Sequence, residues 1–565
     1  MVYQTTKGVR DEAFRSGGRG GLHPLRGDDR RPALVQRRRP DLVPARDRVL
    51  DPPLGGPHAR VPRRRRPHPA PRRRRNRAGA AMNAGAVVAL AVVALAVVIG
   101  LAARGRKQMN LEQWTVAGRS YGTLLFWVLA AGETYSTFTY LGASGFAYAN
   151  GGAAFYIAGY GTCAFVLSYF FLPPLWRYAK KHNLVTQADF FTHRFRSPWF
   201  GALTAIVGVA FMIPYIEAQL LGLGQIVETT TGINRVTSMV LAVVLIAVFV
   251  YASGMKAAAW VSVLKDILLI GTVLVVGIAI PVHYFGGFGH LVDTVQAQHP
   301  GFLGVPAPGS PLGVPWMMST LLVTSAAFFM FPHALAAMYT AKSEQTIRRN
   351  AIYLPLYQIL IALTLFVGFA AVLVVPGLKG SGTNGALLSL TLKTMPSWVV
   401  GLVGGAGALA AIVPISLLLL QSATLLARNV YQGVLRPKTS ELGVFRLSRA
   451  LVVVVTAVAL VFAIFQPALL VNLLLTGQNG VSQFFPAIVL GLVWRRLTKA
   501  GAATGLVVGV AIVAWTVLAS KNTLWGLNPG LLAIAVNVVL TVGVSLATSE
   551  RREPTVRAEA VEGVA

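Results

Sequence analysis

The sequence predicts an all-α membrane protein with about 13 transmembrane helices. Of its 565 residues, 54% are hydrophobic and only 13% are charged, and the mean hydropathy is +0.60. Soluble domains are about one quarter charged, so an ordinary soluble enzyme is excluded. The long apolar runs are continuous rather than alternating, which favours helices over a β-barrel. The single cysteine, Cys163, excludes a disulfide scaffold.

The first 81 residues differ from the rest of the chain. They contain 22 Lys and Arg, 7 Asp and Glu and 11 Pro, and they show no apolar periodicity. We expect residues 1–81 to be a disordered Arg/Pro-rich extension, because such a segment cannot bury enough surface to offset its ordering entropy. It lacks interleaved aromatics and a zinc pattern, so no nucleic-acid partner is expected. A start of translation at Met82, directly before an apolar run, is the alternative explanation.

Residues 82–549 are expected to form the transmembrane domain, and residues 550–565 a cytoplasmic tail. Each apolar stretch can cross about 30 Å of hydrocarbon, which takes roughly 20 helical residues. The 13 stretches lie at 85–103, 123–147, 153–175, 200–225, 237–253, 258–281, 314–338, 350–375, 397–428, 446–466, 468–494, 501–519 and 529–548.

The distribution of Lys and Arg predicts the orientation in the membrane. If the first helix enters from outside, 24 Lys and Arg from Met82 onward fall in cytoplasmic segments and four fall outside. Positive charge is retained on the cytoplasmic side, so we expect the mature N-terminus outside and the C-terminus in the cytoplasm of a multi-pass cell membrane protein.

Polar residues interrupt four of these stretches, where each is costly unless it is paired or used. The second stretch contains Gly132, Glu133, Thr134, Tyr135 and Ser136, the fourth Glu217 and Gln219, the sixth Lys265 and Asp266, and the eleventh Gln478 and Asn479.

The cluster in the second stretch predicts a locally unwound helix. Freed backbone carbonyls can bind a cation or a substrate where they line a cavity. Hydroxyls alone would also fit a regular helix, since they can bond back to carbonyls one turn earlier. Glu133 decides for a functional site, because a carboxylate in lipid needs a cation or a proton.

The other charged residues leave alternatives open. Lys265 and Asp266 are adjacent, so we do not expect them to face each other. Lys265 either snorkels to the cytoplasmic interface or binds an anionic substrate. His333, which follows Pro332, is expected to be structural rather than a proton relay.

At this point the residues resemble a known family, the solute:sodium symporters. The run from Phe485 to Ala502, FPAIVLGLVWRRLTKAGA, resembles the family's Pro, Gly-Leu-Phe-Trp and Arg, Ala-Gly-Ala signature. Residues 114–119, 142–152 and 254–260 add further similarity, and the resemblance covers nearly the whole chain from Met82.

Within the family, the sequence is most similar to bacterial monocarboxylate permeases for pyruvate, lactate and related acids. The residues that carry this narrower resemblance are Gly132-Glu133, Tyr135, Pro214-Tyr215, Gln219, Lys265-Asp266, Phe331 to Leu335, Thr346 to Ala351, Val413-Pro414 and Ala427 to Asn429.

The resemblance implies two inverted five-helix repeats, the leucine-transporter-type fold, with one leading and two trailing helices. It also implies a central cavity lined by the second, fourth, seventh and eleventh stretches. The polar residues found above lie in these stretches, and from them we expect the substrate near Thr134, Ser136, Glu217, Gln219, Lys265, Gln478 and Asn479. At the position of Glu217 the resemblance itself offers only an apolar residue.

The coupling cation stays open between H⁺ and Na⁺. Sodium-coupled members of the family place two hydroxyl residues in the ninth stretch, where this chain has Val413 and Pro414. The carbonyls of Gly132, Tyr135 and Ala410 could still hold Na⁺. Glu133 is the expected replacement, either as a proton carrier or as a direct sodium ligand, and we favour the proton.

The sequence therefore predicts a secondary active symporter for a small monocarboxylate, with no cofactor besides the coupling ion. An enzyme is not expected, because Cys163 has no partner and no His-Glu-x-x-His pattern occurs. A passive channel and a sodium-coupled symporter for another small solute, such as an amino acid, remain as alternatives.

Overall fold

The computed structural model describes residues 84–103, 110–465 and 468–548, and these residues are almost entirely helical. They contain no β-strand, only two isolated β-bridges, Tyr121 with Ala341 and Leu524 with Leu527. The predicted all-α class is therefore confirmed. The expected extension over residues 1–81 and the expected tail over residues 550–565 lie outside the described residues.

Nine helical segments of the described residues are at least 18 residues long and apolar enough to cross a membrane. They overlap nine of the 13 expected stretches, and one of them, Phe138–Lys181, also covers the end of the second stretch. Their bounds are Ala84–Ala102, Phe138–Lys181, Pro198–Thr231, Gly254–Phe285, Glu344–Val374, Ser397–Leu435, Glu441–Phe465, Lys499–Leu518 and Pro529–Thr548. Their lipid-facing surface includes exposed Phe170, Trp199 and Ile267. Exposed apolar side chains are expected on helices whose surface contacts lipid.

Of the other four expected stretches, three are divided into shorter helical pieces, and the fifth is part of the longer helix α8 (Arg235–Phe285). The second is α3 (Thr123–Thr134), η2 (Phe138–Gly142) and α4 (Ala143–Asn150); the fifth is the first part of α8; the seventh is α10 (Val314–Ala327), η4 (Phe328–Met330) and α11 (Pro332–Tyr339); and the eleventh is α17 (Leu470–Val481), η8 (Ser482–Phe484) and α18 (Phe485–Val493). The seventh bends by 52° at Phe331 and brings the count to ten if it is one span. The count of 13 spans stays a prediction.

The remaining elements connect these spans. Their bounds are α1 (Ala84–Ala102), α2 (Leu111–Val116), η1 (Ala117–Arg119), η3 (Gly151–Phe155), α5 (Tyr156–Lys181), α6 (Gln187–Arg194), α7 (Pro198–Thr231), α8 (Arg235–Phe285), α9 (Phe288–Gln298), α12 (Glu344–Tyr353), η5 (Leu354–Tyr357), α13 (Gln358–Val374), η6 (Gly380–Gly385), α14 (Ala386–Thr394), α15 (Ser397–Thr424), η7 (Leu425–Leu435), α16 (Glu441–Phe465), α19 (Lys499–Leu518) and α20 (Pro529–Thr548).

The fifth and sixth stretches join in one continuous element, α8, which turns sharply at Gly254. This residue has φ 56° and ψ −144°, and a Cβ there would lie 2.3 Å from the Trp114 ring. Only glycine adopts this backbone without strain. The two expected spans are therefore separated by a kink within α8.

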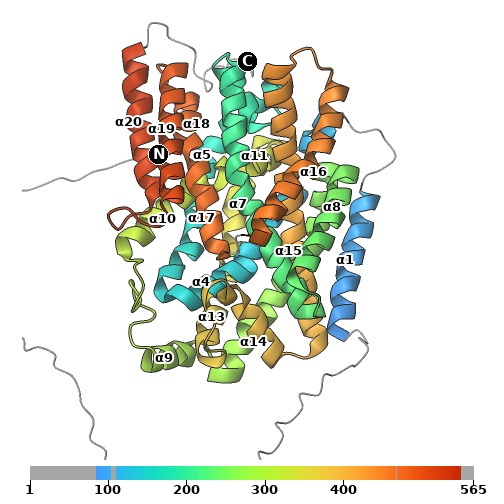
Figure 1. The fold of residues 1–565 in the computed structure, drawn as a ribbon, viewed down its shortest axis with the longest axis vertical. Coiled ribbons are helices and arrows are strands. Elements are labelled where there is room, and N and C mark those ends of the chain that lie inside the picture. The colour runs from blue at the N-terminus through green and yellow to red at the C-terminus, as the bar shows by residue number, and fades with distance from the viewer. Residues whose placement is uncertain (1–83, 104–109, 466–467, 549–565) are drawn as a thin grey trace, which may run out of the picture. The chain divides into compact units, whose positions relative to one another are not determined.

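The core of the described residues is built around α15, whose 28 residues are almost all buried. It packs against α1, α7 and α8, while α3 packs against α8 and α17 packs against α7. The last two helices, α19 and α20, run side by side (Figure 1). The divided helices α3 and α17 therefore each pack against a longer helix, α8 and α7 respectively.

Candidate functional site

The second stretch is unwound where the sequence predicted it. α3 ends at Thr134, Tyr135 has φ −92° and ψ 94°, an extended backbone, and the helix resumes at Phe138 as a π-helical turn. Gly132 allows α8 to approach this end, because a Cβ on it would lie 2.3 Å from the hydroxyl oxygen of Ser262. The break therefore lies directly against α8.

The side chain of Lys265 reaches from α8 into this break. Its Nζ donates to the carbonyl oxygens of Gly132 at 3.0 Å, Tyr135 at 2.6 Å and Ala131 at 3.4 Å. The same nitrogen lies 3.0 Å from Oδ1 of Asp266. Lys265 is fully buried. The Lys265 ammonium thus occupies the carbonyl oxygens of Gly132 and Tyr135, which the sequence analysis expected to bind a mobile cation.

Two expectations about this lysine were wrong. Lys265 does not snorkel to the interface, since its exposed fraction is 0%. It also forms an ion pair with Asp266 although the two are adjacent. Neighbouring Cα–Cβ bonds diverge on a helix, but four rotatable bonds let the lysine ammonium fold back toward the carboxylate.

Ser136 and Gln219, both expected to bind substrate, are bonded to each other. Gln219 Nε2 donates to Ser136 Oγ at 3.1 Å, and Gln219 Oε1 accepts from the Thr137 amide at 3.2 Å and its hydroxyl at 2.6 Å. The Tyr215 hydroxyl lies 3.5 Å from Ser136 Oγ. Gln219 thereby replaces hydrogen bonds that the unwound segment lost, which a buried backbone requires.

Glu133 faces a residue that the sequence analysis treated as structural. Its Oε1 lies 2.7 Å from Nε2 of His333, and its Oε2 accepts from the Thr134 hydroxyl at 3.3 Å. His333 is fully buried at the second position of α11, just after the bend, and its Nδ1 has no hydrogen-bond partner among the described residues. The Pro332-His333 pair, at what is a helix break in the structure, is the sequence signal that could have identified it.

We refer to Glu133, Ser136, Gln219, Lys265 and His333 together as the helix-break cluster. Beside it lies a cavity of about 20 Å³, enough for one or two water molecules. Its lining comes from the second, fourth, seventh and eleventh stretches, as expected, and α5 adds Tyr160: Glu133, Thr134, Phe138, Tyr160, Tyr215, Phe328, Phe331, Leu474 and Gln478. In this conformation the cavity beside Glu133 is therefore too small for a substrate molecule.

The two predicted amides of α17 do not share one cavity. Gln478 lines the small cavity beside Glu133, whereas Asn479 lines a larger one of about 480 Å³. Lys521 and Asn528 contribute to the larger cavity, and Asn479 Oδ1 has no hydrogen-bond partner among the described residues. Consecutive residues on a helix point about 100° apart, which explains the division.

Glu217 lies apart from the helix-break cluster. Tyr215 and Gln219, each two residues away on α7, contact Ser136, and side chains two residues apart point about 200° apart on a helix. Glu217 is buried, does not line either cavity described above, and its Oε1 has no hydrogen-bond partner in the described part of the chain.

Ala410 lies in the buried interior of α15, four residues before Pro414. Proline has no amide hydrogen, so the Ala410 carbonyl lacks its regular helical partner. Val413 and Pro414 are buried and bring no side-chain oxygen. At positions 410–414 the middle of α15 therefore offers a free backbone acceptor but no side-chain hydroxyl.

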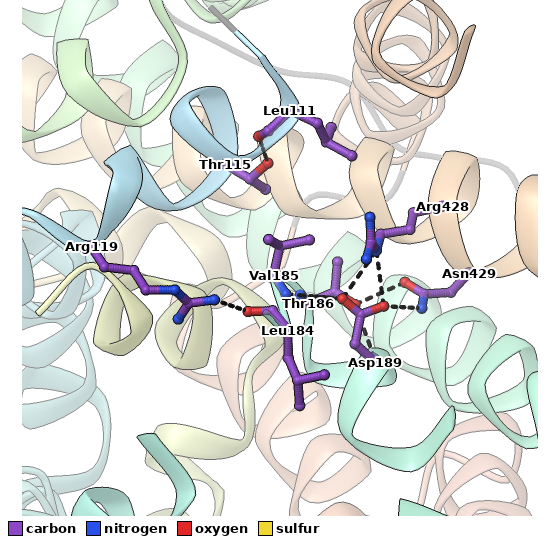
Figure 2. A network of polar contacts seen from close by, with 9 residues as sticks. All are labelled: Leu111, Thr115, Arg119, Leu184, Val185, Thr186, Asp189, Arg428 and Asn429. Carbon is purple, nitrogen blue, oxygen red and sulfur yellow. Dashed lines mark hydrogen bonds and ion pairs between the residues drawn. The ribbon is translucent and has the colours of Figure 1, made fainter. Parts of the chain in front are cut away.

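A second polar cluster, the α6–η7 network, joins the side chains of Thr186, Asp189, Arg428 and Asn429 (Figure 2). Asp189 accepts from the amides of Val185 and Thr186, from Asn429 Nδ2 at 2.7 Å and from Arg428 Nε at 3.1 Å. Burial would raise the pKa of Asp189, but Arg428 and these hydrogen bonds hold it below its usual value.

The same figure shows how this network is extended toward the N-terminal side of α3. Arg119 Nη2 donates to the Leu184 carbonyl at 2.5 Å, one residue before Val185 (Figure 2). Arg119 also lies 3.6 Å from a Glu112 carboxylate oxygen.

In the described ranges, no group of three or more His, Cys, Asp or Glu side chains could hold a metal ion.

Comparison with known proteins gives a consistent result. The model of the sodium:solute symporter family matches residues 114–509. The uncharacterized symporter YhjB of Bacillus subtilis is 42% identical over 484 residues, covering 83% of this chain and 98% of YhjB. The monocarboxylate transport permease protein of Rhizobium johnstonii is 27% identical over 462 residues, covering 79% of this chain and 93% of the permease.

A solved structure shares the fold. It is a Na⁺-coupled sialic acid symporter in a substrate-bound outward-open state, with a TM-score of 0.69 and 18% identity, covering 84% of this chain and 99% of the symporter.

Proposed function

The chain belongs to the sodium:solute symporter family, and we propose that within it this protein takes up a small monocarboxylate, such as pyruvate, lactate or acetate, together with a proton. Membership makes the protein a membrane-embedded transporter rather than an enzyme, and a cation-coupled symporter. The identity of the acid and of the coupling ion is the proposed part.

One observation carries the proposal: the Glu133 carboxylate lies 2.7 Å from His333 Nε2 beside an internal cavity. The Nε2–H of an imidazolium can pair with only one carboxylate at a time in so small a space. A proton on Glu133 releases His333 to pair with the carboxylate of the substrate. The proton and the acid then bind together, and the net charge in the low-dielectric site does not change.

The surroundings of His333 suit a carboxylate. His333 is at the start of α11, whose N-terminal amides and helix dipole favour negative charge. Gln478, Tyr160 and Tyr215 line the same cavity and can donate hydrogen bonds. Phe138, Phe328 and Phe331 would contact the short apolar part of such an acid.

The relative from Rhizobium johnstonii supports the substrate class, since its printed name is that of a monocarboxylate transport permease. Transport would proceed by alternating access, in which the site opens to each side in turn around the broken helices. From the distribution of Lys and Arg we keep the orientation proposed above, in the cell membrane with the C-terminus in the cytoplasm.

The alternative is sodium-driven uptake of another small solute, such as an amino acid. The solved sialic acid symporter, which is Na⁺-coupled, is the observation that favours it. Both proposals make the protein a concentrative symporter, and they differ in the driving ion and the cargo.

Uptake by the full chain in proteoliposomes tests the proposal. We expect labelled pyruvate to accumulate under an imposed pH gradient, inside alkaline, without sodium, and to be displaced by lactate and acetate but not by proline or glucose. Accumulation driven by sodium at zero pH gradient would contradict proton coupling. Displacement by proline alone would contradict the substrate class, and equilibration without accumulation would indicate a channel.

A further inference from the structure

The carbonyl oxygens at the end of α3 form a site for positive charge. Gly132 and Tyr135 have carbonyls that the unwound backbone leaves without regular helical partners, whereas the Ala131 carbonyl also accepts from the Tyr135 amide at 2.8 Å. The C-terminal end of a helix carries partial negative charge, so a cation is stabilised there. In membrane transporters, such carbonyls at a broken helix are where coupling cations bind.

This site is filled by the protein's own ammonium group. Lys265 Nζ lies 2.6 to 3.4 Å from three carbonyl oxygens of Ala131, Gly132 and Tyr135. An ammonium has three donors, and these oxygens with Asp266 satisfy all of them. None is left to direct toward the cavity beside Glu133, whose lining does not include Lys265.

The charge at the break is also balanced without a mobile ion. Asp266 lies 3.0 Å from Lys265 Nζ, and both side chains are buried. A sodium ion on the same carbonyls would put a second positive charge next to the ammonium, and like charges repel strongly in low dielectric. Neither Val413 nor Pro414 brings a side-chain oxygen to complete the shell of a hard cation.

We propose that Lys265 is a tethered cation, which occupies the carbonyl site at the end of α3 in place of a sodium ion, so that the wild-type protein binds no sodium there. Only one consequence of this inference rests on the proposed symport: if Lys265 fills the site, the coupling charge must enter at another group, Glu133. The occupancy itself concerns the folded protein and can be measured without substrate.

Removing the lysine side chain should convert the site into one for a free ion. In Lys265→Ala, the carbonyls of Gly132 and Tyr135 and the Asp266 carboxylate remain around a vacated space, and these are oxygen ligands of the kind that sodium prefers. The matched control is Lys256→Ala, the same substitution nine residues earlier on α8, at a half-buried lysine.

Thermal unfolding of the purified full chain is measured in NaCl, KCl and choline chloride at equal ionic strength. We expect the unfolding temperature of the wild type to be the same in the three salts, and likewise that of Lys256→Ala. Lys265→Ala should unfold at a lower temperature in choline chloride and regain stability saturably with NaCl, more than with KCl. Lys265→Arg, which keeps the charge, should show no sodium response.

Two results would overturn the inference. One is a sodium response of the wild type that Lys256→Ala keeps and Lys265→Ala loses, and the other is the absence of any sodium response in a folded Lys265→Ala. If Lys265→Ala cannot be purified, equilibrium binding of ²²Na⁺ to the wild type decides instead. No saturable binding supports the inference and saturable binding contradicts it. These readouts need no transport, so a failed uptake assay leaves them unaffected.

Discussion

The helix-break cluster and the α6–η7 network are both buried and charged, but they differ in how completely their groups are paired. In the α6–η7 network, Asp189 has Arg428, Asn429 and two backbone amides around one carboxylate. In the helix-break cluster, Glu133 shares one imidazole and borders a cavity, and His333 Nδ1 has no partner in the described part of the chain.

The difference separates structural from exchangeable charge. A carboxylate that accepts several hydrogen bonds from fixed donors stays charged and holds its elements together. A carboxylate with one titratable partner and an adjacent space can change partner when a proton or an anion arrives. Within the helix-break cluster itself, the Lys265 ammonium has all its donors paired and is structural, whereas the Glu133 carboxylate has one titratable partner and is the exchangeable charge.

Glu133→Gln should have the largest effect. The amide cannot carry a proton through the transport cycle, so we expect concentrative uptake to fall to the level of empty liposomes while the protein still inserts and folds. Labelled pyruvate uptake under a pH gradient measures this, with size-exclusion elution as the check on folding. The control is Glu228→Gln, at a half-buried ion pair with Arg235. Uptake unchanged in Glu133→Gln would remove this carboxyl from the mechanism.

Gln219→Leu should mainly lower stability. It removes the acceptor of the Thr137 amide and hydroxyl and the donor to Ser136, all buried, at about 3 kcal/mol in total. The unfolding temperature in detergent measures the loss. Gln225→Leu is the matched control, since Gln225 is a buried residue on the same helix whose side-chain amide lies beside Gly385. Equal losses in both variants would mean that Gln219 does not support the break.

Asp189→Asn should cost about 2 kcal/mol at neutral pH, because it weakens charge-assisted hydrogen bonds to Arg428 and the backbone. The pKa of Asp189 is lowered in the folded protein, so its stabilising contribution is complete above the ordinary value of 3.8 and is lost as the pH falls through the lower folded value. The stability difference between wild type and Asp189→Asn should therefore shrink below about pH 4, measured by unfolding at several pH values. A difference that grows on acidification would contradict this pairing.

Glu217→Gln should have the smallest effect on transport. Glu217 was expected to contact substrate, but it lies on the other side of α7 from Tyr215 and Gln219 and outside the cavity lining. We expect its pyruvate uptake to remain within about twofold of wild type, a difference of less than about 0.5 kcal/mol in transition-state free energy. A loss as large as that of Glu133→Gln would show that the site opens toward Glu217 during transport.

The linear sequence was sufficient to predict the all-α membrane class, the positions of the apolar helices and the unwinding after Gly132. These depend on local properties: hydrocarbon thickness sets helix length, and glycine with polar residues in an apolar run marks a break. The family resemblance rests on the same local runs, such as the one from Phe485 to Ala502.

Which polar group meets which was decided only by the tertiary structure. Glu133 and His333 are 200 residues apart in the chain, and Lys265 donates to carbonyls that lie 130 to 134 residues before it. A sequence assigns a cost to each buried charge but not its partner, because the partner depends on how helices far apart in the chain pack and on where a flexible side chain reaches. For the same reason Ser136 and Gln219, both predicted to bind substrate, were found bonded to each other, and Gln478 and Asn479 on two different cavities.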